Sequence, residues 1–111
     1  MNEVREKAVA RLMELPTVIS NAEERTAGST WSLAAARDAL TDAESAARIS
    51  GECDGPNAEA RAAQVRAKTI SEREALRTAE HRHALNQAHL SALQSELVAL
   101  HAVADLLRCA P

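Results

Sequence analysis

The side chains best suited to acid–base or metal chemistry in this 111-residue chain are four histidines, all between residues 81 and 101. No two of them are four residues apart, which is the spacing that brings two imidazoles together on one helix in HExxH-type zinc sites. His101 and Asp105 form an i, i+4 pair, which on a helix is typical of a modest surface contact rather than of a general base with its orienting carboxylate. We therefore predict neither a metal site nor a catalytic histidine.

Motifs for phosphate binding and nucleophilic catalysis are missing from the sequence. The chain has three glycines and contains no GxxxxGKS/T, GxGxxG or GxSxG motif, and these motifs supply the loops and turns that such chemistry needs. Its two cysteines, Cys53 and Cys109, have no CxxC spacing, so neither a zinc site nor a disulfide framework is indicated. We expect a protein that is not an enzyme and that has no cofactor.

Basic residues between positions 57 and 82 are the candidate anion-binding side chains. This segment contains six basic and four acidic residues. Nucleic-acid binding, by contrast, normally requires a clustered basic face and, for single strands, several aromatic residues. We expect a solvated, salt-bridged surface, with two alternatives: a nucleic-acid accessory protein, or a sponge for a small anionic ligand. The arginines concerned are Arg61, Arg66, Arg73, Arg77 and Arg82.

The longest regular pattern is an apolar seam in the segment 71–109, which contains neither glycine nor proline. Its positions alternate steps of three and four residues, the period of a coiled-coil contact face. His83 and Asn86 interrupt it, and polar groups inside such a seam fix register or partner number when they are hydrogen-bonded. The alternative is that this end of the helix is open to water or lies beneath the helix expected over 57–68. The seam consists of Leu76, Ala79, His83, Asn86, Leu90, Leu93, Leu97, Leu100, Ala104 and Leu107.

A second stripe repeats with the same steps, and we expect it to lie beside the seam and widen it. A face that wide needs a partner besides a helix over 21–50, and this second partner is either an N-terminal helix over 3–15 or another subunit. The segment 71–109 is also longer, at about 60 Å, than a helix over 21–50, at about 45 Å. Both features predict an uncovered surface that favours self-association. The second stripe consists of Leu85, Ala88, Ala92, Ser95, Ala99, Ala102 and Leu106.

The rest of the chain predicts three shorter helices over residues 3–15, 21–50 and 57–68. Pro16 is expected to end the first helix, and Gly28 is a candidate break in the second because glycine weakens helix interiors. The segment GECDGP at 51–56 predicts a chain reversal, and Asn57 is the expected N-cap of the third helix. Leu33 and the apolar residues after it repeat at the same 3, 4 spacing, which makes the second helix the partner of the long one.

Composition agrees with an all-α fold. Hydrophobic residues make up 46% of the chain but aromatic residues only 1%, so its apolar content is mainly Ala and Leu, as in long packed helices. We predict one helical domain over 1–111: an antiparallel helical hairpin or coiled coil, with a short N-terminal helix and a short helix in the connection, completed by oligomerisation. No apolar run of about 18 residues and no signal-peptide pattern are recognised, so we expect a cytoplasmic protein without a membrane partner.

The segment 55–76 carries a short motif, Gly-x-Asn-Ala-Glu-x-Arg, ahead of the long Ala/Leu-rich helix. Its residues are Gly55, Asn57, Ala58, Glu59 and Arg61. With this motif the chain resembles small helical proteins encoded by tailed bacteriophages and prophages, over residues 40–107. The resemblance implies a phage origin, the host cytoplasm as location, and a role such as that of an inhibitor or an accessory factor.

The pattern therefore favours a non-enzymatic, self-associating helical protein that acts by binding another macromolecule, in the first place another protein. Trp31 is either a packing anchor or an exposed contact residue at the start of the Leu33 stripe. The expected interface residues are Trp31, Leu90, Leu93, Leu97, Leu100 and Leu107.

Overall fold

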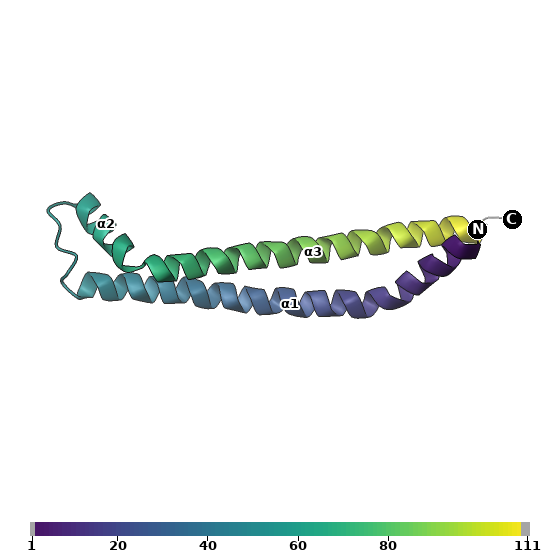
Figure 1. Cartoon of the computed structure of the whole chain (residues 1–111), viewed down its shortest axis with the longest axis horizontal. Coiled ribbons are helices and arrows are strands. Elements are labelled where there is room, and N and C mark those ends of the chain that lie inside the picture. Colours follow the sequence, from purple (N-terminus) through teal and green to yellow (C-terminus); the bar gives the residue numbers. More distant parts are fainter. Residues whose placement is uncertain (1, 110–111) are drawn as a thin grey trace. The chain divides into compact units, whose positions relative to one another are not determined.

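The structure is a computed structural model that describes residues 2–109, and these residues form three α-helices and no strand. They are α1 (Asn2–Ile49), α2 (Ala58–Lys68) and α3 (Ile70–Cys109). The long helices α1 and α3 pack as a hairpin, and α2 lies in their connection (Figure 1). The predicted all-α class and helical hairpin are confirmed.

The described residues group into two compact units, and each unit contains a part of both long helices. Residues 2–28 and 84–109 form the first unit, and residues 29–83 form the second. In the first unit Leu15, Ala22 and Leu93 are buried together. They form its core. Five half-buried side chains pack against it: Val18, Ile19, Leu90, Leu97 and Leu100.

Helix α1 runs through Pro16, so the predicted break between residues 15 and 21 is wrong. Proline lacks a backbone N–H and its ring clashes with the carbonyl four residues earlier, which costs about 3 kcal/mol and kinks a helix. Figure 1 shows α1 bent in its N-terminal part, as expected for an internal proline. Leu15 is fully buried and Val18 packs against the same core. Because packing on both sides of Pro16 stabilises the helix, tertiary contacts outweigh the local cost.

Gly28 does not interrupt α1 either. Because α1 is continuous, the expected length difference between the two long helices, which predicted an uncovered surface, is not present. With 48 residues against 40 in α3, α1 is not the short partner that a helix over 21–50 would have been. All ten predicted seam positions of α3 are buried or half-buried. No part of the seam is therefore left exposed for lack of partner length.

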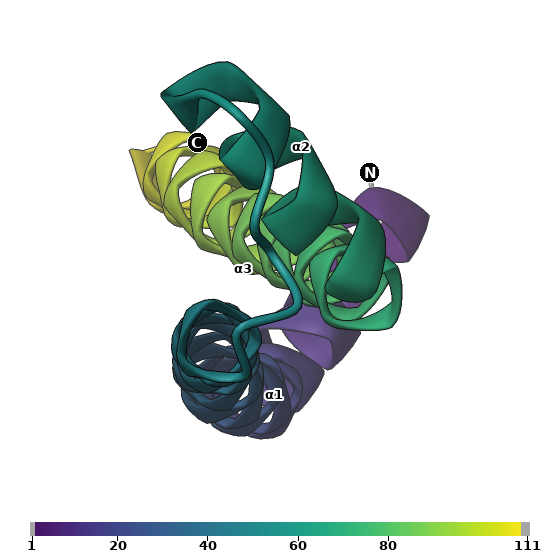
Figure 2. The same ribbon diagram turned by 90° about the vertical axis from the view of Figure 1, so that its left-hand side faces the viewer.

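In the second unit, α1 ends at Ile49 and the chain turns through Gly51, whose φ of +78° is the left-handed conformation that glycine adopts without strain. Figure 2 shows the loop rising from the end of α1 to α2, which leads into α3. Asn57 caps α2, because its side-chain Oδ1 accepts a hydrogen bond from the Ala60 N–H at 2.8 Å. The predicted chain reversal and N-cap are confirmed.

The residues of the Gly-x-Asn-Ala-Glu-x-Arg motif hold this turn together. A Cβ at Gly55 would lie 2.7 Å from the Cβ of Ala60, so the loop approaches α2 too closely for any side chain. The Gly55 N–H donates to Gln64 Oε1 at 2.8 Å, and Arg61 Nη1 donates to the Gly55 carbonyl at 3.1 Å. Three of the five motif residues, Gly55, Asn57 and Arg61, thus have structural roles in this turn.

The break between α2 and α3 centres on Thr69, which is 1% exposed. Its hydroxyl donates to the Val65 carbonyl at 2.9 Å and accepts from Arg73 Nε at 3.1 Å. Its own carbonyl accepts the N–H of Arg73 at 3.0 Å, which starts α3. One buried side chain therefore closes one helix and anchors the first turn of the next.

Candidate interaction surface

The predicted seam of α3 is the face that packs inside the chain. Leu93 is buried against Leu15 and Ala22 of α1, and Leu90, Leu97 and Leu100 pack around this core. Leu107 is half-buried. Of the expected interface residues, those on the seam therefore form contacts within the hairpin.

In the second unit the seam histidine has a partner on α1. The Oγ of Ser29 lies 2.7 Å from Nδ1 of His83, and Ser29 is only 5% exposed. A hydrogen bond between two specific seam positions is lost when one helix slides along the other, so this pair favours a single register.

We expect Ser29→Ala to lower the free energy of unfolding by about 1–2 kcal/mol more than Ser32→Ala, because it leaves the ring of His83 without this bond. Ser32 is exposed on the same helix, so both substitutions share the gain in helix propensity. Chemical denaturation followed by circular dichroism measures the difference. Equal effects of the two substitutions would show that the Ser29–His83 bond does not stabilise the fold.

In the first unit Asn86 joins α3 to the backbone of α1. Its Nδ2 donates to the Arg25 carbonyl at 3.3 Å, and its own carbonyl accepts from Thr26 Oγ1 at 3.5 Å. The Thr26 hydroxyl lies 2.9 Å from the Ala22 carbonyl, within hydrogen-bonding distance. His83 and Asn86 are thus half-buried, bonded seam residues, and the alternative of an end open to water is excluded.

Among the described residues of the first unit, one ion pair joins the charged side chains of α1 and α3. Arg11 Nε lies 2.8 Å and 3.0 Å from the two carboxylate oxygens of Glu96, and its Nη1 lies 3.2 Å from Glu14. These hydrogen bonds, first that of Glu96 and then that of Glu14, raise the pKa of the Arg11 guanidinium. The carboxylate of Glu96 is therefore directed toward α1.

The second stripe lies on the far side of α3 from the seam, and the expectation that it widens the seam is wrong. Each of its residues follows a seam residue by two positions, which is a rotation of about 200° around a helix. All seven residues are exposed. Leu85 is 57% and Leu106 is 74% exposed, and the adjacent Val98 is 70% exposed. We call these eight residues the outer face: Leu85, Ala88, Ala92, Ser95, Val98, Ala99, Ala102 and Leu106.

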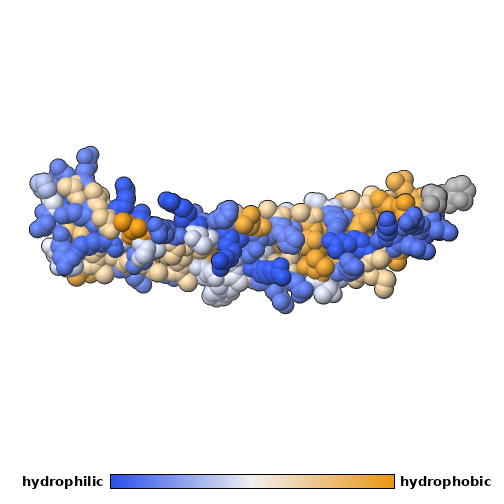
Figure 3. Space-filling model, viewed as in Figure 1, coloured by the Kyte–Doolittle hydropathy of each residue, from blue (hydrophilic) through white to orange (hydrophobic). Residues whose placement is uncertain are grey.

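The outer face is poor in charge as well as exposed. From residue 70 to 83 α3 carries six charged residues, whereas from 84 to 104 it carries one, Glu96, which is paired with Arg11. In the view of Figure 3, hydrophobic side chains lie at the surface toward the C-terminal end of α3, and hydrophilic and hydrophobic side chains alternate over the rest of the visible face. Solvated helix faces normally carry many charges, so this composition is typical of a contact surface.

By length and composition α3 also passes a test for a membrane-crossing helix, with a mean hydropathy of 1.3 in its most apolar window, although little of that window is buried. Such a test is met by many core helices of soluble proteins. The sequence has no uninterrupted apolar run of about 18 residues, but α3 meets this criterion of average hydropathy, so the absence of a membrane partner stays a prediction.

The five candidate anion-binding arginines do not converge. Arg73 is paired with Glu44 at 3.4 Å and Arg61 is bonded to the loop. Arg66, Arg77 and Arg82 are exposed, on α2 and α3. Arg77 and Arg82 are five residues apart, so they project roughly 140° from each other around α3.

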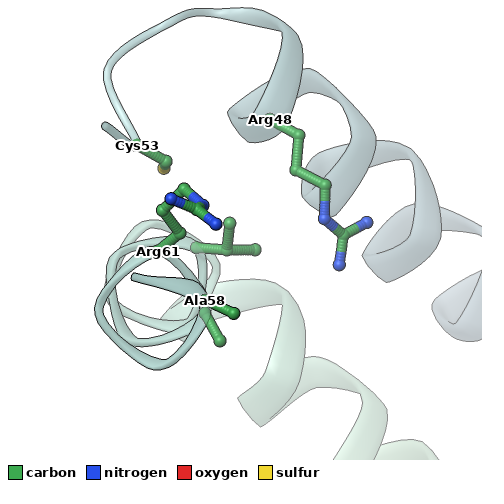
Figure 4. Close-up of a pocket in the computed structure, with 6 residues that line it drawn as sticks. Arg48, Cys53, Ala58 and Arg61 are labelled. Carbon is green, nitrogen blue, oxygen red and sulfur yellow. The ribbon is translucent and has the colours of Figure 1, made fainter. Parts of the chain in front are cut away.

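A cavity of about 400 Å³ lies between the end of α1 and α2 in the second unit. Arg48, Cys53 and Arg61 line it over the apolar side chains of Ala58, Ala62 and Val65. Figure 4 shows the Arg48 side chain extending along α1, away from Cys53 and Arg61. Arg48 also lies 3.6 Å from Glu44. The two guanidinium groups therefore do not point at a common position for an anion.

Other candidate residues are isolated. Trp31 is 78% exposed, so it is not a packing anchor and remains as a candidate contact residue. The carboxylate of Asp105, which the sequence predicted as a surface partner of His101, forms an ion pair with Arg108. Among residues 2–109 no three His, Cys, Asp or Glu side chains lie close enough together to hold a metal ion.

Comparison of the chain with protein-family models, with curated proteins and with solved structures finds no match.

Proposed function

We propose that this protein is a non-enzymatic, self-associating helical binding protein that acts through protein–protein contacts, and that the outer face of α3 is its contact surface. The observation that carries the proposal is the combination of exposure and low charge on one side of α3 over residues 85–106. This mode of action fits the inhibitors and accessory factors implied by the resemblance to helical phage proteins.

The physical argument starts from the free energy of exposed apolar surface. Apolar side chains in water contribute about 25 cal/mol of stabilisation for each Å² that becomes buried, and contiguous exposed apolar patches mark interaction sites. Leu85, Val98 and Leu106 are all more than half exposed. The 3, 4 repeat of the outer face is also that of a helix which packs along another helix. A helical partner therefore fits this surface best.

The test is the mass of the protein in solution. A single chain has a mass of 11.9 kDa, and multi-angle light scattering at micromolar concentration should report twice this mass or more. Ala92→Glu, which places a charge on the outer face, should return the mass to that of a single chain. Ala10→Glu, the same change at an exposed position of α1, should leave the assembly unchanged.

A wild-type protein that remains monomeric throughout the micromolar range would refute self-association. Titration with single- and double-stranded DNA at two salt concentrations tests the alternative use of the arginines, because binding to phosphates weakens steeply as salt increases. Salt-sensitive binding that is lost in Arg77→Ala and unchanged in Ala92→Glu would favour the nucleic-acid function instead.

A further inference from the structure

Building on the proposed function, we infer that the occupant of the outer face is the same face of a second copy of this chain. The two α3 helices run antiparallel, and the two-fold axis passes close to Ser95.

The repeating side chains of the outer face have the same order in both directions along α3. From residue 85 to 106 its repeating positions are Leu, Ala, Ala, Ser, Ala, Ala and Leu, with Ser95 in the centre. A two-fold axis perpendicular to the helices reverses the direction of the second copy, so it places Leu85 near the partner's Leu106 and each alanine near an alanine. Such an interface is isologous, since one patch meets itself.

The outer face carries a shallow hollow that Val98 helps to line. Ser91, Gln94, Ser95 and Val98 line a shallow hollow of about 450 Å³ on α3, and Val98 is the large apolar side chain at its edge. With the axis near Ser95, Val98 of one copy lies level with Ala92 of the other, next to Ser91. The valine of each copy then enters the hollow formed by the two serines of the other copy. Knob-into-hole contacts of this kind are the packing unit of paired helices.

The small residues in the middle of the outer face let the two helices approach closely. Interaxial distances of packed helices start at about 8 Å, and that lower limit requires small side chains at the contact. Ala88, Ala92, Ala99 and Ala102 provide them over a length of about 21 Å at 1.5 Å per residue.

Electrostatics favours the antiparallel over the parallel arrangement. In a parallel pair in register each charged residue lies at the same level as its own copy, as Arg82 does, and like charges that come close together are destabilising. The antiparallel pair separates the two Arg82 residues by roughly 40 Å along the helix axis. It also places the opposite ends of the two helix dipoles together.

A second copy is the occupant because the chain offers no other matching surface within the described residues. The large exposed apolar residues of α1 do not repeat at steps of three and four; they are Val4, Val9, Met13, Trp31 and Ile49. Charged residues surround them. Within the described residues, the surface that matches the outer face of one copy in length, in side-chain size and in lack of charge is therefore the outer face of a second copy.

Disulfide cross-linking tests the arrangement in a variant without native thiols, Cys53→Ser with Cys109→Ser. A disulfide needs Cα atoms within about 7 Å, which helices 8 Å apart provide for directly facing residues. Ser95→Cys should form a covalent dimer by itself on mild oxidation. Ala88→Cys and Ala102→Cys should each remain uncrosslinked alone, since in the antiparallel pair identical residues lie roughly 20 Å apart, and should form a dimer when mixed.

The outcomes separate this inference from the proposed function. Self-crosslinking of Ala88→Cys as efficiently as Ser95→Cys would show a parallel pair and overturn the inference. A light-scattering dimer in which none of the three variants crosslinks would also overturn it, while leaving self-association intact. A monomeric mass without crosslinks would refute both. Circular dichroism of each variant checks that the helices are retained.

Discussion

Leu15→Ala and Leu93→Ala are each expected to lower the free energy of unfolding by about 2–5 kcal/mol, the range for large-to-small substitutions in packed cores. Leu15 is 0% and Leu93 is 5% exposed, and they are buried together with Ala22. Removing either side chain takes apolar atoms from the centre of the first unit and leaves a cavity. Urea denaturation followed by far-ultraviolet circular dichroism measures the loss.

Leu85→Ala and Leu106→Ala are the matched controls, because they remove the same atoms from the exposed side of α3. At protein concentrations where the chain is monomeric they should change the free energy of unfolding by no more than about 0.5 kcal/mol. At higher concentrations their cost should grow, because the outer face then becomes part of an interface and dimerisation adds stability. Equal losses for all four leucines in the monomer would contradict the assignment of the inner face.

Gly55→Ala is expected to lower the free energy of unfolding by about 1–3 kcal/mol, as overpacked substitutions do. The added Cβ would lie 2.7 Å from the Ala60 Cβ and 3.1 Å from the Ala60 backbone carbon. The loop must then move, and this weakens its hydrogen bonds with Gln64 and Arg61. Thermal and urea denaturation both report the change.

Gly28→Ala is the matched substitution for Gly55→Ala, and its expected change in the free energy of unfolding has the opposite sign. Gly28 lies inside α1, and nothing lies within 4 Å of a Cβ added there. Alanine should therefore stabilise the protein by about 0.5–1 kcal/mol, because it lowers the conformational entropy of the unfolded chain without a clash. Destabilisation by Gly28→Ala would mean that α1 requires flexibility at this position.

Local patterns in the sequence predicted the parts of the fold that depend on near neighbours. The steps of three and four from Leu76 to Leu107 place ten positions on one side of a helix whatever its partner is, and all ten are covered. Asn57 was recognisable as an N-cap because its hydrogen bond reaches only to Ala60. Among these seam positions, the partners of His83 and Asn86 were not predictable, since they lie 54 and 61 residues away.

The sequence already contained the information that places the second stripe, because each of its residues follows a seam residue by two positions. Two residues correspond to about 200° of rotation, which places the stripe opposite the seam and not beside it. What covers that side depends on where α1 lies, and α1 packs on the seam side. The exposure of the outer face is therefore a result of tertiary packing combined with a pattern that the sequence already contained.

By itself, then, the sequence determined the helical class, the inner seam, the turn at 51–56 and the cap of α2, because each depends on composition or on residues a few positions apart. The tertiary structure decided that α1 continues through Pro16 and that Trp31 is exposed. The first outcome rests on the burial of Leu15 against Leu93, far away in the sequence. The second depends on which side of α1 faces α3. Contacts between distant segments outweigh a local proline penalty of about 3 kcal/mol only in the folded chain.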